Sequence, residues 1–177
     1  MKIALLVAAA LAAIAATPSQ ALTFAYNYKT TSGANLDASG FITTSNFVNG
    51  SGGYSITGIT GNVLGDLITS LTPNPSAPNA QVSASGRFIY DNNLFVTAPY
   101  LSNPGVLFNS SSFEYNLFSD TATQYELIQA NTGGYTQFSV GTFVVSQVPE
   151  PATWSLLVIG FGLVGLSVRR RSTVIAV

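Results

Sequence analysis

The chain has 177 residues, of which 47% are hydrophobic and only 7% charged, and its formal net charge is −1. It contains no cysteine and no histidine. This composition excludes a disulfide framework, a thiolate metal site and a cysteine nucleophile, and it excludes a Ser-His-Asp triad because the general base is missing. Positive charge is scarce away from the C-terminal end, so nucleic acid is not an expected partner. We expect no cofactor and no metal site.

The first 21 residues have the three parts of a secretory signal peptide. Lys2 precedes an apolar run of 14 residues from Ile3 to Ala16. Pro18 follows the run, and the small residues Ser19 and Ala21 then occupy the −3 and −1 positions of a cleavage site. The run is shorter than the roughly 20 residues that a membrane span needs. These features predict export through Sec-type machinery, with cleavage after Ala21. The alternative is an alanine-rich first helix that stays with the protein.

Residues 22–148 are predicted to form one extracytoplasmic β domain. Apolar and polar residues alternate with a period of two in Phe24–Tyr28, Phe113–Leu117 and Thr136–Val145, and helical periodicity is rare. A proline-rich loop, Leu71–Asn79, fits an excursion between strands. The domain carries two basic and six acidic side chains, which give it a formal charge of −4. We predict an all-β fold, a small antiparallel sandwich or open barrel of about seven to ten strands.

One β-hairpin is expected near the middle of this domain. The residues Gly86–Tyr90 and Leu94–Val96 have strand character, and Asp91–Asn93 between them has the composition of a turn. The same three side chains are oxygen ligands that calcium could use, as are those of Ser119–Thr121. Neither segment has the spacing of a calcium loop, so both are interpreted as turns.

Paired carboxylates are the only catalytic option that the composition leaves open. Glu114 and Glu126 lie 12 residues apart on stretches that could form neighbouring strands, and a glycosidase needs two carboxyl groups at a fixed separation. The simpler interpretation is that both are solvent-facing strand residues flanked by inward aromatic side chains. No catalytic motif is found, and we expect a protein that is not an enzyme.

The C-terminal residues 149–177 form a second membrane-related segment. Pro149, Glu150 and Pro151 precede Trp154, and a glycine-containing apolar stretch then extends to an arginine cluster at residues 169–171. The apolar stretch predicts a transmembrane helix over about 152–168. Three arginines at its end should stay cytoplasmic, which places residues 22–149 on the other side of the membrane.

This arrangement resembles the PEP-CTERM tail, and it is closest to the PEPxxWA variant found in exported proteins of Gram-negative bacteria. The resemblance implies recognition and removal by a membrane-embedded exosortase. The implied recognition element is Pro149, Glu150, Pro151 and Trp154, and the implied retention element is the helix with Arg169, Arg170 and Arg171. Ser155 stands where the variant usually has alanine, and residues 172–177 follow the arginines.

The segments Gly53–Gly61, Tyr90–Phe95 and Glu114–Phe118 are similar to those of secreted proteins that carry the same tail, which implies a shared β fold but no activity. The tail resemblance implies a non-enzymatic exported protein. The body would first lie in the periplasm, anchored at the inner membrane, and would then reach the cell surface or the extracellular matrix. Extracellular polysaccharide is an implied partner.

Two other functions remain open. A carbohydrate-binding module would require two or three aromatic side chains exposed on one face. A secreted hydrolase would require a cleft that brings Glu114 and Glu126 within catalytic distance.

Overall fold

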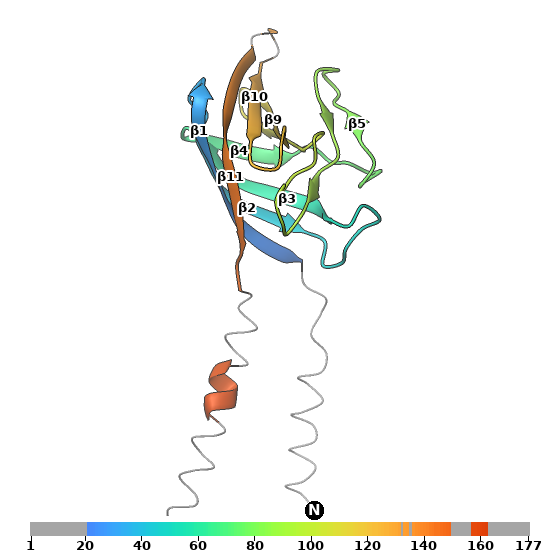
Figure 1. Ribbon diagram of the computed structural model, residues 1–177, viewed down its shortest axis with the longest axis vertical. Helices are drawn as coiled ribbons and strands as arrows, with labels where there is room; N and C mark the ends of the chain where they lie inside the picture. Colours follow the sequence, from blue (N-terminus) through green and yellow to red (C-terminus); the bar gives the residue numbers. More distant parts are fainter. Residues whose placement is uncertain (1–20, 132, 135, 150–156, 163–177) are drawn as a thin grey trace, which may run out of the picture.

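The computed structural model describes residues 21–131, 133–134, 136–149 and 157–162 (Figure 1). The predicted signal peptide, apart from Ala21, lies outside the described residues. Of the predicted transmembrane helix, residues 157–162 are described and are helical. Within the described ranges, no helix has the length and apolar character needed to cross a membrane. Both membrane-related segments therefore stay predictions.

The described part of the domain is built from strands, which confirms the all-β prediction. Its long strands show the alternation of buried and exposed residues that the sequence pattern indicates. The strands are β1 Leu22–Gly33, β2 Ala38–Thr44, β3 Tyr54–Val63, β4 Asp66–Leu71, β5 Gln81–Val82, β6 Ile89–Tyr90, β7 Asn93–Leu94, β8 Val106–Ser110, β9 Glu114–Ser119, β10 Tyr125–Ala130 and β11 Thr136–Gln147.

Eight of these strands close into an antiparallel barrel, so the predicted sandwich or open barrel is wrong in this respect. The order is β2-β1-β11-β10-β9-β8-β4-β3, and β3 pairs again with β2. The closing pair brings Gly40 opposite Gly61. A Cβ atom on either glycine would collide with the backbone of the opposite strand, at Thr60 or Ser39. Closure therefore depends on two glycines that let β2 and β3 approach closely.

The barrel interior is filled by side chains, as expected for a barrel of eight strands. Aromatic rings contribute much of the filling. The Phe108 and Tyr115 rings stack with centroids 5.4 Å apart, and the Tyr125 ring lies 5.4 Å from that of Phe143. The other large, fully buried side chains of this core are Tyr28, Leu36, Ile42, Leu94, Leu101, Leu117, Leu127 and Val63.

A short ribbon formed by β5 and β6 covers part of the outer wall of the barrel. Its buried side chains, Phe88 and Tyr90, pack against Leu107 of β8 and against Ile128 and Ala130 of β10. The expected hairpin over residues 86–96 does not form, because β6 pairs with β5 and β7 pairs with β3.

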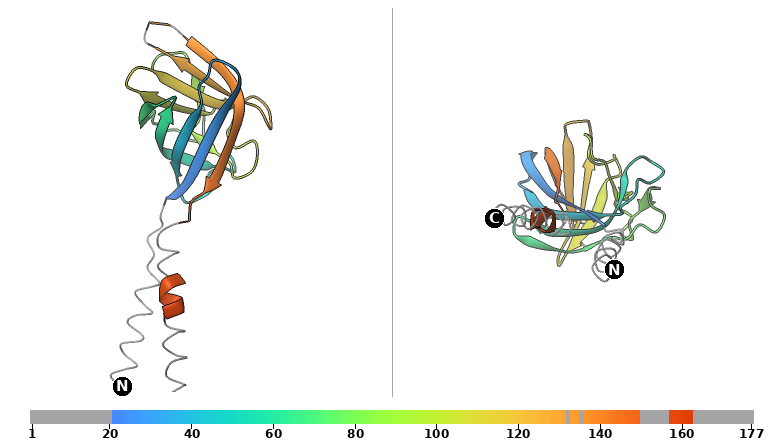
Figure 2. Two further views of the ribbon diagram at one scale, coloured as in Figure 1. Left: turned by 90° about the vertical axis from the view of Figure 1, so that its left-hand side faces the viewer. Right: turned by 90° about the horizontal axis from the view of Figure 1, so that it is seen from below.

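The barrel has two distinct ends (Figure 2). At the first, which we call the exit pole, β1 begins and β11 finishes, and Phe24 pairs with Gln147. At the opposite end, the distal pole, lie the β1–β2, β3–β4, β8–β9 and β10–β11 connections. Both ends of the domain therefore leave the barrel on the same side, away from most of its tight turns.

Candidate functional site

The exit pole carries the start of the predicted sorting motif. Val148 alone separates Gln147, the last residue of β11, from Pro149. The Val148 backbone N–H donates a hydrogen bond to the carbonyl oxygen of Thr23 at 2.8 Å, and Pro149 is exposed. The chain is thus held to the barrel up to the residue before the motif.

The two glutamates considered for catalysis lie on adjacent strands but are not brought together. Glu114 is opposite Ala130, whereas Glu126 is opposite Phe118. The two positions are therefore offset by four residue pairs, or about 13 Å along the strands. Their surroundings also differ. Glu114 accepts a hydrogen bond from the Ser85 hydroxyl at 2.5 Å, while burial raises the pKa of Glu126, and nearby Asp120 raises it further.

The segment Asp91–Asn93 is buried and leads from β6 into β7, and its side chains bond to the protein. Asp91 accepts hydrogen bonds from the Ser102 hydroxyl at 2.6 Å and from the Asn93 backbone N–H at 3.1 Å. Asn92 accepts one from the Leu107 N–H at 3.1 Å. Burial raises the pKa of Asp91. These oxygens tie the connection to the barrel wall, which is a structural role.

The second candidate for calcium, Ser119–Thr121, lies where β9 ends and the β9–β10 connection begins. The Ser119 hydroxyl donates to the Thr121 carbonyl oxygen at 2.6 Å, and the Asp120 N–H donates to the Gln124 carbonyl oxygen. Among the residues that the structure describes, no three acidic side chains are grouped as a metal site would require.

Exposed aromatic side chains do not form a row on the described surface of the barrel. Phe41, Phe47 and Phe138 are 51%, 68% and 46% exposed, and they belong to β2, the β2–β3 loop and β11, respectively. The tyrosines in the described part of the domain are buried or half-buried. The stacking face expected of a carbohydrate-binding module is therefore not formed by these side chains.

The distal pole holds a hollow in the mouth of the barrel, which we call the inner hollow. It measures about 340 Å³. Tyr115 of β9 donates to the carboxylate of Asp66 on β4 at 3.2 Å, and the Gln129 amide of β10 donates to the Tyr115 hydroxyl at 3.1 Å. Burial and the Asp66 charge raise the pKa of Tyr115 to about 12. The hollow is lined by Leu36, Val63, Leu64, Asp66, Ser112, Phe113, Tyr115, Gln129 and Gln137.

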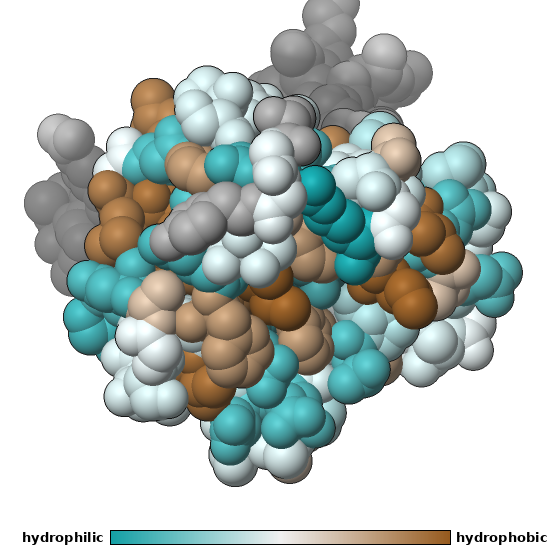
Figure 3. All heavy atoms as spheres, turned by 90° about the horizontal axis from the view of Figure 1, so that it is seen from above, coloured by the Kyte–Doolittle hydropathy of each residue, from teal (hydrophilic) through white to brown (hydrophobic). Residues whose placement is uncertain are grey.

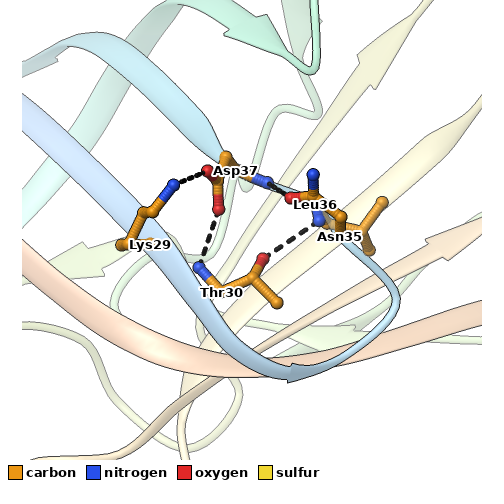
Figure 4. A network of polar contacts seen from close by, with 5 residues as sticks. All are labelled: Lys29, Thr30, Asn35, Leu36 and Asp37. Atoms are coloured by element: carbon orange, nitrogen blue, oxygen red, sulfur yellow. Dashed lines mark hydrogen bonds and ion pairs between the residues drawn. The ribbon is translucent and has the colours of Figure 1, made fainter.

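The β1–β2 loop covers one side of the inner hollow and is fixed by hydrogen bonds (Figure 4). Leu36 is 2% exposed and belongs to the barrel core. The Asp37 carboxylate accepts the Thr30 backbone N–H at 2.8 Å and forms an ion pair with Lys29. The hydrogen bond from Lys29 is the main cause that lowers the pKa of Asp37.

A second, larger depression, the outer hollow, lies beside the first at the distal pole and measures about 490 Å³. The Arg87 guanidinium donates to the Asn131 carbonyl oxygen across it. Ser112 and Phe113, in the β8–β9 turn, line both hollows. The remaining lining residues are Ser85, Asn109, Ser110, Ser111, Glu114 and Ala130.

A comparison with family models finds one match, over residues 147–171, to the PEP-CTERM protein-sorting motif. The chain carries a PEP-CTERM motif. This confirms the family resemblance, and it supports an exported protein that is a substrate of exosortase. No curated protein and no solved structure matches the chain.

The PEP-CTERM match begins at Gln147, the last residue of β11, and ends at Arg171, so the motif and the barrel are adjacent in the chain. The predicted site positions at the tail fall inside the matched range. Their individual roles stay predictions, as does cleavage after Ala21. Pro149 is the one described residue among these tail positions. The other positions lie outside the described residues and are Glu150, Pro151, Trp154, Arg169, Arg170 and Arg171.

Sequence reasoning missed the distal pole. Asp66, Tyr115 and Gln129 come from three strands, and nothing in their local sequence distinguishes them from other strand residues. Arg87 was the one residue whose type could have pointed to this pole, because it is one of only two basic residues in the domain.

Proposed function

We propose that this is a non-enzymatic exported protein whose β-barrel is delivered to the cell surface or the extracellular matrix through its PEP-CTERM tail. The observation that carries the proposal is the sorting motif over residues 147–171, which starts where the last strand of the barrel finishes. Extracellular polysaccharide is the proposed matrix partner.

In this proposal the two ends of the chain act in sequence. The signal peptide directs Sec-type export and is cleaved after Ala21. The tail helix and the arginine cluster at 169–171 then hold the body at the inner membrane until exosortase recognises Pro149, Glu150, Pro151 and Trp154. Since β1 begins at Leu22 and β11 finishes at Gln147, removal of both ends leaves every strand of the barrel intact.

The non-enzymatic role is supported by the surroundings of the acidic side chains. Glu114 and Glu126 are offset along their strands, and Asp91 is buried and bonded to Ser102. Asp37 forms an ion pair with Lys29. Asp37 and Asp91 thus have structural roles, and Glu114 and Glu126 do not form a catalytic pair.

Intact mass spectrometry of the protein from the native cell envelope and culture fluid tests the proposal. We expect a product that starts at Leu22 and finishes between Pro149 and Pro151. Replacing Pro149, Glu150 and Pro151 by alanine should leave Arg171 on the protein in the membrane fraction. The matched control replaces the exposed Pro73 and Pro75 of the β4–β5 loop by alanine.

The control should be processed normally. If the wild-type protein itself retains Arg171 in the membrane fraction, the sorting proposal is wrong, and the chain is a membrane-anchored periplasmic protein.

A further inference from the structure

We propose that the distal pole is a binding site for a neutral oligosaccharide, which lies across Phe113 with one part in the inner hollow and one in the outer hollow. The two hollows measure about 340 and 490 Å³, sizes that are typical of small-ligand sites. They share Ser112 and Phe113, so one extended ligand can occupy both. Figure 3 views this pole, where hydrophilic and hydrophobic side chains are interspersed.

The outer hollow offers hydrogen-bond donors and acceptors in balance. The Arg87 guanidinium can only donate, and the Glu114 carboxylate can only accept. The hydroxyl groups of Ser85, Ser111 and Ser112 can do both. A ligand that matches this lining must also donate and accept at short intervals along its length. Sugar hydroxyl groups have this property.

The charges at the site disfavour an anionic ligand. Arg87 and Glu114 line the same hollow and compensate each other. An anionic ligand would meet Glu114 and Asp66, and the domain as a whole carries a formal charge of −4. An uncharged polyol meets no such repulsion, and Arg87 beside Glu114 leaves the outer hollow without net charge.

The inner hollow combines polar groups with apolar walls, which suits a sugar ring. Asp66 and Gln129 offer a carboxylate and an amide, while Leu36 and Val63 supply apolar surface. Phe113 is half-buried, and its ring packs edge-on against that of Tyr115, with centroids 6.0 Å apart. This contact fixes an aromatic ring between the two hollows, where the C–H face of a sugar can pack against it.

The position of the site agrees with a role in binding outside the cell. The hollows lie at the end of the barrel opposite the exit pole, from which both chain ends leave (Figure 1). The site therefore stays accessible whether or not the tail has been removed. Oligosaccharide binding at the distal pole does not depend on removal of the tail. A failure of the binding proposal can therefore be distinguished from a failure of the sorting proposal.

Binding to an array of neutral and acidic glycans tests the proposal, followed by calorimetry with the best glycan. The full chain is used in a zwitterionic detergent, since a maltoside head group would compete for the site. Ser111→Trp fills the outer hollow from an exposed turn position. Its matched control is Ser146→Trp, which places the same side chain on exposed β11 surface near the exit pole.

We expect binding of a neutral oligosaccharide that Ser111→Trp abolishes and Ser146→Trp leaves unchanged. Phe113→Ala should weaken it about tenfold through loss of the stacked ring. Because Phe113 also contacts Tyr115, circular dichroism must show that the Phe113→Ala variant is folded. Arg87 is exposed and has no core contact, so Arg87→Gln is a second test and should also weaken binding. The proposal is overturned if no glycan binds, if only acidic glycans bind, or if Ser111→Trp binds as tightly as the wild type.

Discussion

Two tyrosines of β1 that enter the same core differ in how their hydroxyl groups are satisfied. Tyr28 is fully buried, and its hydroxyl lies 2.7 Å from that of Ser139 on β11, with which it forms a hydrogen bond. Tyr26 is 4% exposed, and its hydroxyl has no hydrogen-bond partner among the described residues. Burial without a partner raises the pKa of Tyr26 well above its ordinary value. A buried hydroxyl costs free energy unless it is hydrogen-bonded.

The pair predicts opposite effects for the same substitution. Tyr26→Phe should leave the free energy of unfolding unchanged or raise it by up to about 1 kcal/mol, because only an unsatisfied hydroxyl is removed. Tyr28→Phe should lower it by about 1 kcal/mol, because the Ser139 hydroxyl loses its partner. Urea unfolding followed by circular dichroism measures both. Equal destabilisation by the two variants would contradict the difference in hydrogen bonding between the Tyr26 and Tyr28 hydroxyl groups.

Asp37 predicts a small acid-dependent contribution to stability at the β1–β2 loop. Its folded-state pKa lies below the ordinary value of 3.8 because Lys29 and the Thr30 N–H bond the ionised form. The contribution is therefore full above the unfolded-state pKa and is lost as the pH falls through the lowered folded-state value. Since the Lys29 side chain is 67% exposed, solvent screening keeps the ion pair's contribution below about 1 kcal/mol.

The comparison of wild type with Asp37→Asn isolates this contribution. The variant should be slightly less stable at pH 7, and the difference should disappear below about pH 3. Unfolding curves at several pH values measure it. A difference that stays constant between pH 7 and pH 2 would mean that the carboxylate charge is not involved.

At the scale of elements, the β1–β11 pair connects the fold to tail processing. The first residues of β1 and the last of β11 are paired, and Val148 is still bonded to Thr23 one residue before Pro149. Proteins that bind an extended peptide commonly do so through hydrogen bonds to its backbone. Here the backbone upstream of Pro149 is part of the barrel. We therefore expect the exit-pole end of this strand pair to open before the tail is removed.

A disulfide across the strand end tests this expectation. Ala25 pairs with Ser146, and directly opposite residues in an antiparallel pair are close enough for a disulfide. The chain has no cysteine, so a double variant forms one defined cross-link. Oxidised Ala25→Cys/Ser146→Cys should retain its tail, and reduction should restore processing. The control, Ser32→Cys/Val140→Cys, cross-links the same strands towards the distal pole.

Mass spectrometry gives the processed fraction of each cross-linked form. The control should be processed as fast as the wild type. If the Ala25–Ser146 cross-link has no effect either, the enzyme reaches the motif without opening of the strand pair.

At the scale of the whole molecule, the sequence predicted those features that depend on local patterns. The alternation of apolar and polar residues predicted strands, because a strand with one buried face has this pattern. The tail was found because all of its elements lie within about 30 residues. Closure was not predicted, since alternation does not say which strands pair. The contact of Gly40 with Gly61 that permits closure joins positions that look like ordinary turn glycines.

The wrong hairpin and the missed hollows have a related cause. Asp91–Asn93 has the composition of a turn, but its side chains bond residues as distant as Asn49 and Thr72, and burial overrides the local preference. The distal pole depends on the same kind of long-range contact. Its polar chain links Asp66 to Tyr115, 49 residues later.

The closed barrel and its covering ribbon should differ in local stability. Every barrel strand has two hydrogen-bonded neighbours, whereas β5 and β6 pair only with each other, over two residues. Amide hydrogen exchange in the full chain should therefore be slow in β1, β9, β10 and β11, and faster in β5 and β6 through a separate local opening. Because Ser85 and Arg87 connect these two strands and line the outer hollow, an oligosaccharide bound there should slow exchange in the ribbon and leave the barrel strands unchanged. Exchange in the ribbon as slow as in the barrel would show that Phe88 and Tyr90 fix it as firmly as strand pairing does, and that the wall of the hollow is rigid before any ligand binds.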